Sequence, residues 1–211
     1  MTMNVLLAQT ALADAETPAD LAVEVIAEPL RGMITLRADL TAASTGAALG
    51  SVFGLETPTV RRGTENGDVR ALWMAPDEVM IHCEYQQAGA KTAELSEALS
   101  TEHHLAVNVS DMRQVITLRG AGARQVLAKG APVDLHPDSF GVGDLRRTRV
   151  GTVAAAFYQI SDAPETFEVF CFRSYAPYFY EWLCASAKNG ALRRSVDRSA
   201  ALSGEEFGRR N

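Results

Sequence analysis

The sequence predicts an α+β fold of two similar halves, with antiparallel sheets and helices on one face of each sheet. The same order of elements (strand, helix, hairpin, helix) occurs twice along the chain. The two hairpin turns also match, because Ala75-Pro76-Asp77 and Ala163-Pro164-Glu165 each lie between apolar strands and precede a helix. We therefore expect a structural duplication in which each half is a split β-α-β unit.

The first half is predicted over residues 33–103, and its first strand shows the alternation of apolar and polar residues that is typical of a half-buried strand. A polar turn or loop separates the first helix from the hairpin. A helix exposed on one side follows the hairpin. In order, the predicted strand, alanine-rich helix, polar turn or loop, two hairpin strands and final helix are residues 33–37, 41–49, 61–68, 69–74, 78–83 and 86–100.

The second half is predicted over residues 104–187 and has the same kinds of element. Ser174 is a plausible N-cap for its last helix, because a serine hydroxyl accepts hydrogen bonds from the first backbone N–H groups of a helix. In order, the predicted two strands, short helix, loop, two hairpin strands and final helix are residues 105–109, 114–118, 121–129, 131–144, 153–160, 167–172 and 174–187.

The two ends of the chain differ in charge from each other and from the body. The 211 residues carry a formal net charge of -6, which argues against a phosphate-binding surface over the whole chain and hence against a nucleic-acid partner. Residues 1–32 are small, acidic and weakly patterned, and we expect a flexible arm. Residues 188–211 have six basic against three acidic side chains and are predicted to be a basic tail.

Hydropathy and cysteine usage indicate a cytoplasmic protein. No apolar run approaches the roughly 18 residues that a membrane-spanning helix needs. Cys83, Cys171 and Cys184 form an odd, scattered set, which predicts small buried residues in a reducing compartment and not a disulfide framework.

A search for catalytic equipment finds no preassembled site. Gly120-Ala121-Gly122 follows a strand and opens a helix, but Gln125 stands where a dinucleotide-binding turn needs a small residue. The four histidines lack the spacing of metal ligands, and neither a nucleophile elbow nor a phosphate-binding loop is present. The sequence therefore predicts no catalytic, cofactor-binding or metal-binding residues in this chain.

The last helix carries the most distinctive pattern, an aromatic stripe at i, i+3, i+4 and i+7. The stripe consists of Tyr175, Tyr178, Phe179 and Trp182. Such a stripe is typical of the inward face of a helix, and it is also typical of a partner-binding face, because Tyr and Trp are enriched at interfaces. Tyr180 points away from the stripe, and Trp73 has the same two interpretations. The candidate contact residues are Trp73, His136, Tyr175, Tyr178, Tyr180 and Trp182.

Several segments carry a family resemblance that extends over about residues 33–187. They are LWMAPDE (72–78), VNVSD (107–111), LRGAGARQVLAKG (118–130), PVDLHP (132–137), FRSY (172–175) and EWL (181–183). Together they resemble the gamma-subunit family of heterotetrameric sarcosine oxidases, and the stretch over 118–137 is the most specific part.

This resemblance implies a supporting role in a larger enzyme. Such heterotetramers oxidise sarcosine to glycine and make hydrogen peroxide, and the one-carbon unit leaves as formaldehyde or as methylene-tetrahydrofolate. The alpha and beta subunits hold the flavins, NAD and folate, the delta subunit holds a metal, and the gamma subunit is expected to be non-catalytic. Its fold is similar to the folate-binding domain of the glycine cleavage T protein and of the tRNA-modifying GTPase.

Two alternatives stay open at this point. One is a stand-alone folate-binding protein of the aminomethyltransferase kind, although no segment here matches the catalytic acid region of T proteins. The other is a gamma-like subunit of a related oxidoreductase acting on another N-methylated amino acid. For the subunit hypothesis, the expected contact regions are the aromatic helix, the loop at 134–144 and the charged tails.

Overall fold

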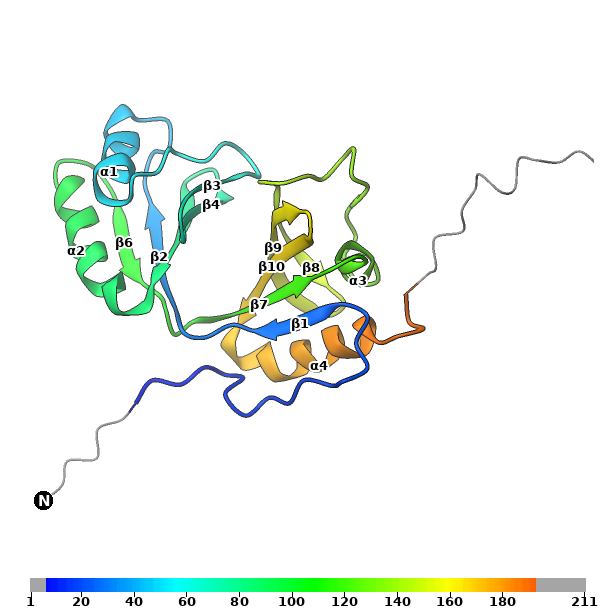
Figure 1. The fold of residues 1–211 in the computed structure, drawn as a ribbon. Helices are drawn as coiled ribbons and strands as arrows, with labels where there is room; N and C mark the ends of the chain where they lie inside the picture. The colour runs from blue at the N-terminus through cyan, green and yellow to red at the C-terminus, as the bar shows by residue number, and fades with distance from the viewer. Residues whose placement is uncertain (1–6, 193–211) are drawn as a thin grey trace, which may run out of the picture.

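The computed structural model describes residues 7–192, and within this range the chain forms two five-stranded antiparallel sheets (Figure 1). The first sheet has the spatial order β3 (Gly63–Asn66), β4 (Val69–Ala75), β5 (Glu78–Glu84), β2 (Arg31–Arg37) and β6 (Leu105–Asn108). The second has the order β8 (Leu145–Val150), β9 (Val153–Asp162), β10 (Glu165–Phe172), β7 (Arg113–Arg119) and β1 (Glu24–Ala27). The helices are α1 (Ala43–Phe53), α2 (Ala88–Ala98), α3 (Ala123–Ala128) and α4 (Ala176–Ala187).

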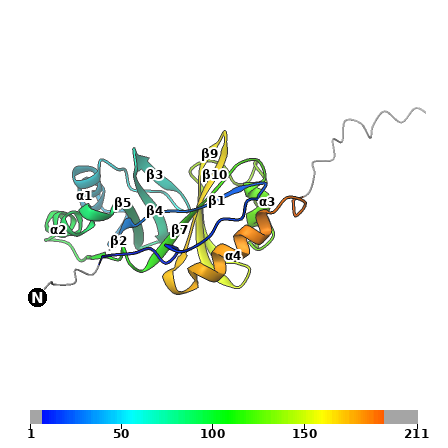
Figure 2. The ribbon, with the colours of Figure 1, turned by 60° about the horizontal axis from the view of Figure 1, so that its bottom comes forward.

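The sheets and helices form four layers, with helices outside and the two sheets between them (Figure 2). One apolar cluster joins α1 and α2 to the outer face of the first sheet, and another joins α3 and α4 to the outer face of the second. A third cluster, which includes Met33, Leu72, Met80, Val115 and Phe170, comes from both sheets and fills the space where their inner faces meet. This arrangement confirms the predicted α+β class, because each sheet has helices on one face.

The duplication is complete at the level of elements. Two short 3-10 turns, η1 (Tyr85–Gln87) and η2 (Arg173–Tyr175), precede α2 and α4, so β1-β2-α1-β3-β4-β5-η1-α2 is followed by β6-β7-α3-β8-β9-β10-η2-α4. The interior strands β2 (RGMITLR) and β7 (RQVITLR) share the pattern Arg-x-x-Ile-Thr-Leu-Arg. This short repeat was the internal signal that sequence reasoning missed.

The two halves exchange their first strands. β1 pairs with β7 in the second sheet, and β6 pairs with β2 in the first. The two exchanges share one register, because Glu24 lies opposite Arg119 as Leu105 lies opposite Arg37. Each sheet is therefore completed by a strand from the other half of the sequence.

The N-terminal segment differs from the flexible arm predicted over residues 1–32. Leu12, Val23 and Val25 are buried in the core of the second sheet, and β1 lies within this segment. The pattern is hard to detect because β1 has only four residues and takes its hydrogen bonds from a strand much later in the chain. Residues 1–6 of the predicted arm lie outside the described residues.

The C-terminal segment makes contact with this arm before the described range ends. Lys188 forms an isolated bridge with Leu21, and the Asn189 N–H donates to the Asp20 carbonyl at 3.0 Å. The start of the predicted basic tail is therefore tied to the N-terminal segment, and residues 193–211 lie outside the described residues.

Two edge strands and one helix start also differ from expectation. The polar stretch 61–68 contains β3, and β8 follows the predicted loop, although three of its six residues are arginines. Edge strands are commonly polar and charged, which removes the apolar alternation on which the prediction relied. Ser174 does not cap α4 with its side chain, because the chain enters this helix through η2.

Candidate functional site

A buried charge cluster lies where the two sheets face each other. Glu168 of β10 is 2% exposed, and its Oε1 accepts hydrogen bonds from Arg31 Nη1 of β2 at 3.2 Å and from Arg70 Nη1 of β4 at 3.0 Å. His82 of β5 is fully buried, with Nδ1 3.8 Å from Glu168 Oε2 and its ring edge-on to Phe170. Strand alternation turns all of these side chains toward the other sheet.

The electrostatics of the cluster favour an ionised Glu168 and a neutral His82. Burial opposes the charge on Glu168, but positively charged groups around it, among them Arg70 and Arg31, outweigh this effect and hold the pKa of this carboxyl well below its usual range. Burial also lowers the pKa of His82, which Glu168 only partly offsets. Since the 3.8 Å separation exceeds a hydrogen bond and the imidazole is neutral, the two guanidinium groups are the direct partners of Glu168.

A cleft of about 870 Å³ opens beside the cluster, and Arg70 and Glu168 form part of its lining together with Thr117 and Tyr85. Within the described residues, Glu168 Oε2 has no hydrogen-bond partner. Cys83 is also a lining residue, and burial raises the pKa of its thiol, so this thiol stays protonated near neutral pH. The geometry therefore provides a buried ionic tie between the halves and no activated nucleophile among these lining groups.

The rest of residues 7–192 shows no group of three or more His, Cys, Asp or Glu side chains arranged to hold a metal ion. All three cysteines are buried and free. Among the described helices, none is long and apolar enough to cross a membrane.

Sequence reasoning did not find the buried charge cluster. Its members come from four strands, and Glu168 is separated from Arg31 by 137 residues, so no local spacing connects the whole cluster. The available signals were a glutamate within the apolar run Phe167-Glu168-Val169-Phe170 and a histidine within the apolar strand β5. A charged residue at the centre of an apolar strand indicates a buried partner.

The six candidate contact residues are not brought together in one place. Tyr175 and Tyr178 are exposed, with 52% and 54% of their surface accessible, and His136 is exposed in the loop before β8. Trp73 is half-buried and lines a groove with Arg61 and Arg146 on β8. The contact role of these four residues stays a prediction.

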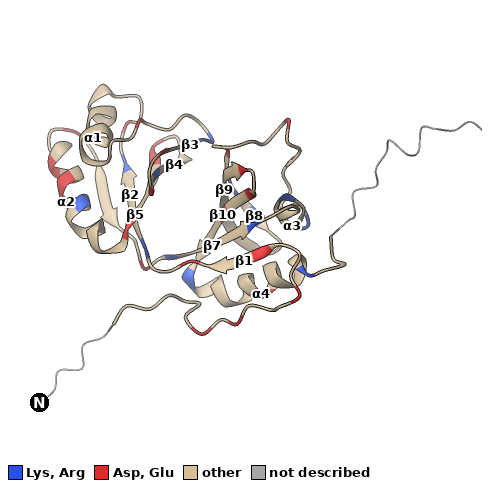
Figure 3. Cartoon of the chain, viewed as in Figure 1, with Lys and Arg blue, Asp and Glu red and all other residues tan. Residues whose placement is uncertain are grey.

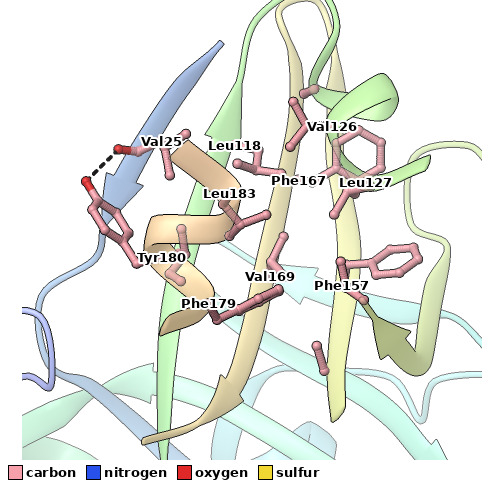
Figure 4. Close-up of a cluster of buried hydrophobic side chains, with 14 of the residues drawn as sticks. Val25, Leu118, Val126, Leu127, Phe157, Phe167, Val169, Phe179, Tyr180 and Leu183 are labelled. Atoms are coloured by element: carbon pink, nitrogen blue, oxygen red, sulfur yellow. Dashed lines mark hydrogen bonds between the residues drawn. The ribbon is translucent and has the colours of Figure 1, made fainter. Parts of the chain in front are cut away.

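Tyr180 and Trp182 pack inside the chain instead. Tyr180 is 3% exposed, and its hydroxyl bonds with Thr17 Oγ1 at 2.7 Å and donates to the Val25 carbonyl at 3.2 Å (Figure 4). Trp182 is half-buried and stacks on Phe179, with its ring so close to Gly130 that a Cβ there would lie 2.8 Å from it. Tyr180, a candidate contact residue, is therefore a core residue in this structure, whereas the contact role of the half-buried Trp182 stays a prediction.

The inward face of α4 also differs from the predicted aromatic stripe. Its buried residues recur at steps of three and four and are Ala176, Phe179, Tyr180, Leu183, Cys184 and Ala187. Tyr175 and Tyr178 lie off this face. The predicted stripe was based on aromatic residues alone, whereas small and aliphatic residues form most of the buried face of this helix.

Comparison with solved structures identifies the class of fold. Over 90% of its length, the chain superposes on 99% of a chain of the heterotetrameric sarcosine oxidase from Corynebacterium sp. U-96 in complex with pyrrole 2-carboxylate, with a TM-score of 0.77 and 24% identity. It also resembles the glycine cleavage system aminomethyltransferase T from Bartonella henselae over 76% of this chain and 45% of that one, with a TM-score of 0.56 and 14% identity. The fold is thus the one that these proteins share.

Sequence comparison then identifies the family. The model of the sarcosine oxidase, gamma subunit family matches residues 37–189. The sarcosine oxidase subunit gamma of Corynebacterium sp. (strain U-96) is 31% identical over 144 residues, which cover 66% of this chain and 68% of that relative. The subunit gamma of an Arthrobacter species is 30% identical over 57% of each chain. The chain belongs to the sarcosine oxidase gamma subunit family, as the sequence resemblance indicated.

Proposed function

We propose that this chain is a non-catalytic gamma subunit of a heterotetrameric sarcosine oxidase. In this proposal it supports the oxidative demethylation of sarcosine to glycine, with peroxide and either formaldehyde or methylene-tetrahydrofolate as products. Alpha, beta and delta subunits are its partners, and the alpha and beta subunits hold the flavins, NAD and folate. Family membership over residues 37–189 is the observation that carries the proposal.

The chemistry of the described residues supports a structural role. Glu168, the carboxylate of the buried charge cluster, accepts hydrogen bonds from two guanidinium groups of its own chain. A carboxylate held in this way is stabilised in its ionised form and is a weak proton acceptor. The three buried cysteines form no disulfide, which is consistent with a protein located in the reducing cytoplasm.

Co-expression with the candidate alpha, beta and delta subunits tests this proposal. The expected result is co-purification of all four chains in equal amounts, with sarcosine-dependent peroxide production that falls when this chain is omitted. Parallel assays with other N-methylated amino acids distinguish a related oxidoreductase from sarcosine oxidase. A chain that purifies alone under these conditions would count against the proposal.

The cleft between the halves favours a second candidate, a stand-alone folate-binding protein. It is large enough for a small ligand, and one of its lining residues is Glu168, whose Oε2 accepts no hydrogen bond among the described residues. Calorimetric titration of the isolated chain with tetrahydrofolate distinguishes the two functions. Binding would support the stand-alone folate-binding protein, whereas no heat and no thermal shift at millimolar tetrahydrofolate would exclude this second function.

A further inference from the structure

We propose that three exposed aromatic residues and one arginine form the surface that binds a partner subunit of the complex. The aromatic surface consists of Phe172, Tyr175, Tyr178 and Arg113. We infer that the partner presents an apolar side chain flanked by carboxylates. This inference rests on the proposed function and adds the place and the chemistry of the contact.

The duplication provides a comparison within the same chain. Residues 81–90 and 169–178 occupy equivalent places, running from the last hairpin strand through a 3-10 turn into a helix, and their buried and exposed positions match one by one. Where the second half has its three exposed aromatic residues, the first half has Glu84, Gln87 and Ala90. The fold therefore accepts polar or small residues at these positions, so core packing does not explain the aromatic ones.

The same comparison shows that Arg113 has no directly bonded carboxylate, although Glu78 acts on its charge through space. Its equivalent in β2 is Arg31, which bonds to Glu168, but the residue equivalent to Glu168 in the first half is Met80. Within residues 7–192, Arg113 forms no ion pair, and its buried Nε has no hydrogen-bond partner. A partner carboxylate would give Arg113 the bond that Arg31 already has.

The surroundings of Arg113 and Phe172 suit an apolar anchor. The Arg113 Cζ lies 4.6 Å from the centroid of the Phe172 ring, a cation–π arrangement. Next to this pair is a shallow pocket of about 550 Å³, lined by Ala11, Met112, Phe172, Arg173, Ser174 and Pro177. Tyrosine and arginine beside a small pocket are the composition of interface hot spots.

The charges around the aromatic surface also indicate an acidic partner. Figure 3 shows α4 as a largely uncharged helix, whereas its equivalent α2 carries both acidic and basic residues. Within the described residues, Arg173 next to the pocket forms no ion pair, and its Nη2 donates to the Gln9 carbonyl at 2.7 Å. An acidic rim on the partner would therefore meet two arginines that form no ion pair among the described residues, and this is the charge complementarity that we infer for the partner subunit.

The test exchanges the aromatic residues for those that the first half has at the equivalent positions. The triple variant Phe172→Glu, Tyr175→Gln and Tyr178→Ala is co-expressed with the partner subunits, and its affinity for them is measured by biolayer interferometry. We expect affinity to fall by at least about tenfold. Thermal unfolding of the isolated chain should be little changed, because the first half folds with these residues. The matched control, Gln87→Ala with Ala90→Ser, should bind like the parent.

Arg113→Met provides an independent readout. We expect weaker binding and a smaller dependence of affinity on salt, since one charge pair is lost. If the parent chain does not assemble with the subunits, the proposed function fails. If the parent assembles and the triple variant binds equally well, this inference is overturned. It is also overturned if the isolated parent chain dimerises and the triple variant does not, because the occupant would then be a second copy.

Discussion

At the scale of single residues, the buried charge cluster is the most consequential feature of the chain. One carboxylate from the second sheet meets two guanidinium groups from the first, with all three side chains removed from most solvent contact. Removing one member of such a cluster lowers the free energy of unfolding strongly, because a remaining charge stays buried without its partner. Glu168, Arg31 and Arg70 therefore fix how the two sheets sit on each other.

Replacing Glu168 with glutamine should destabilise the chain strongly. The substitution keeps the shape but removes the buried charged acceptor of two guanidinium groups, which are left with only the more exposed Glu28 and Glu65. We expect a loss of about 2–4 kcal/mol in the free energy of unfolding. Urea unfolding measures this change. The control is Glu65→Gln, which removes the exposed partner of Arg70 and should change stability by less than about 1 kcal/mol. Equal effects in both variants would contradict a special role for the buried carboxylate.

His82 should make stability depend on pH. Because burial lowers its pKa in the folded chain, the unfolded chain binds more protons below the ordinary value near 6.5. Stability contributed by neutral His82 is therefore present above about pH 6.5 and is lost as the pH falls below it. Glu168, whose folded pKa is lowered, adds a further loss in more acidic solution.

The variant His82→Phe isolates this contribution, since phenylalanine stands at the equivalent position of the second half as Phe170. Unfolding free energies measured between about pH 5 and 7 should rise less steeply with pH than in the parent. His103→Gln, which changes an exposed histidine, is the control and should keep the parent slope. A parent-like slope in His82→Phe would show that His82 is not the titrating group.

At the scale of elements, sequence patterns predicted the strands and helices with periodic apolar residues and missed the strands that are short or polar. The two hairpins and the helices following them agree with expectation because their strands are long and apolar. β1, β3 and β8 were missed since each lies at a sheet edge, where four residues or a row of arginines give no alternating signal. The inward face of α4 was predicted incorrectly because Tyr180 is a core residue whose polar hydroxyl finds its hydrogen-bond partner inside the chain.

Tyr180→Phe should loosen the N-terminal segment selectively. It removes the hydroxyl that contacts Thr17 and Val25, and we expect a loss of about 1 kcal/mol. Hydrogen exchange measured by mass spectrometry should show faster exchange over residues 17–25 than elsewhere in the chain. Tyr178→Phe is the matched control, because this tyrosine is exposed. Faster exchange spread evenly over the chain would instead indicate a general loss of stability.

At the scale of the whole molecule, the duplication was predictable and the exchange of strands was not. Two matching sets of elements are visible in the sequence, but a pairing between β1 and β7 is a contact across almost a hundred residues. Local propensity contains no information about such pairings. The charge cluster depends on the same long-range geometry, which is why neither it nor the unpaired Arg113 could be found from spacing alone.

The exchange predicts that neither half folds alone. A cut after Glu102, in the turn between α2 and β6, gives fragments 1–102 and 103–211. The first fragment lacks β6, the second lacks β1, and each exposes its share of the apolar cluster between the sheets. Expressed separately, the fragments should show no cooperative thermal unfolding by circular dichroism. Expressed together, they should co-purify in equal amounts and unfold cooperatively, because each supplies the strand that the other needs. Cooperative unfolding of either fragment alone would mean that the exchanged strand is dispensable and that the halves are independent folding units.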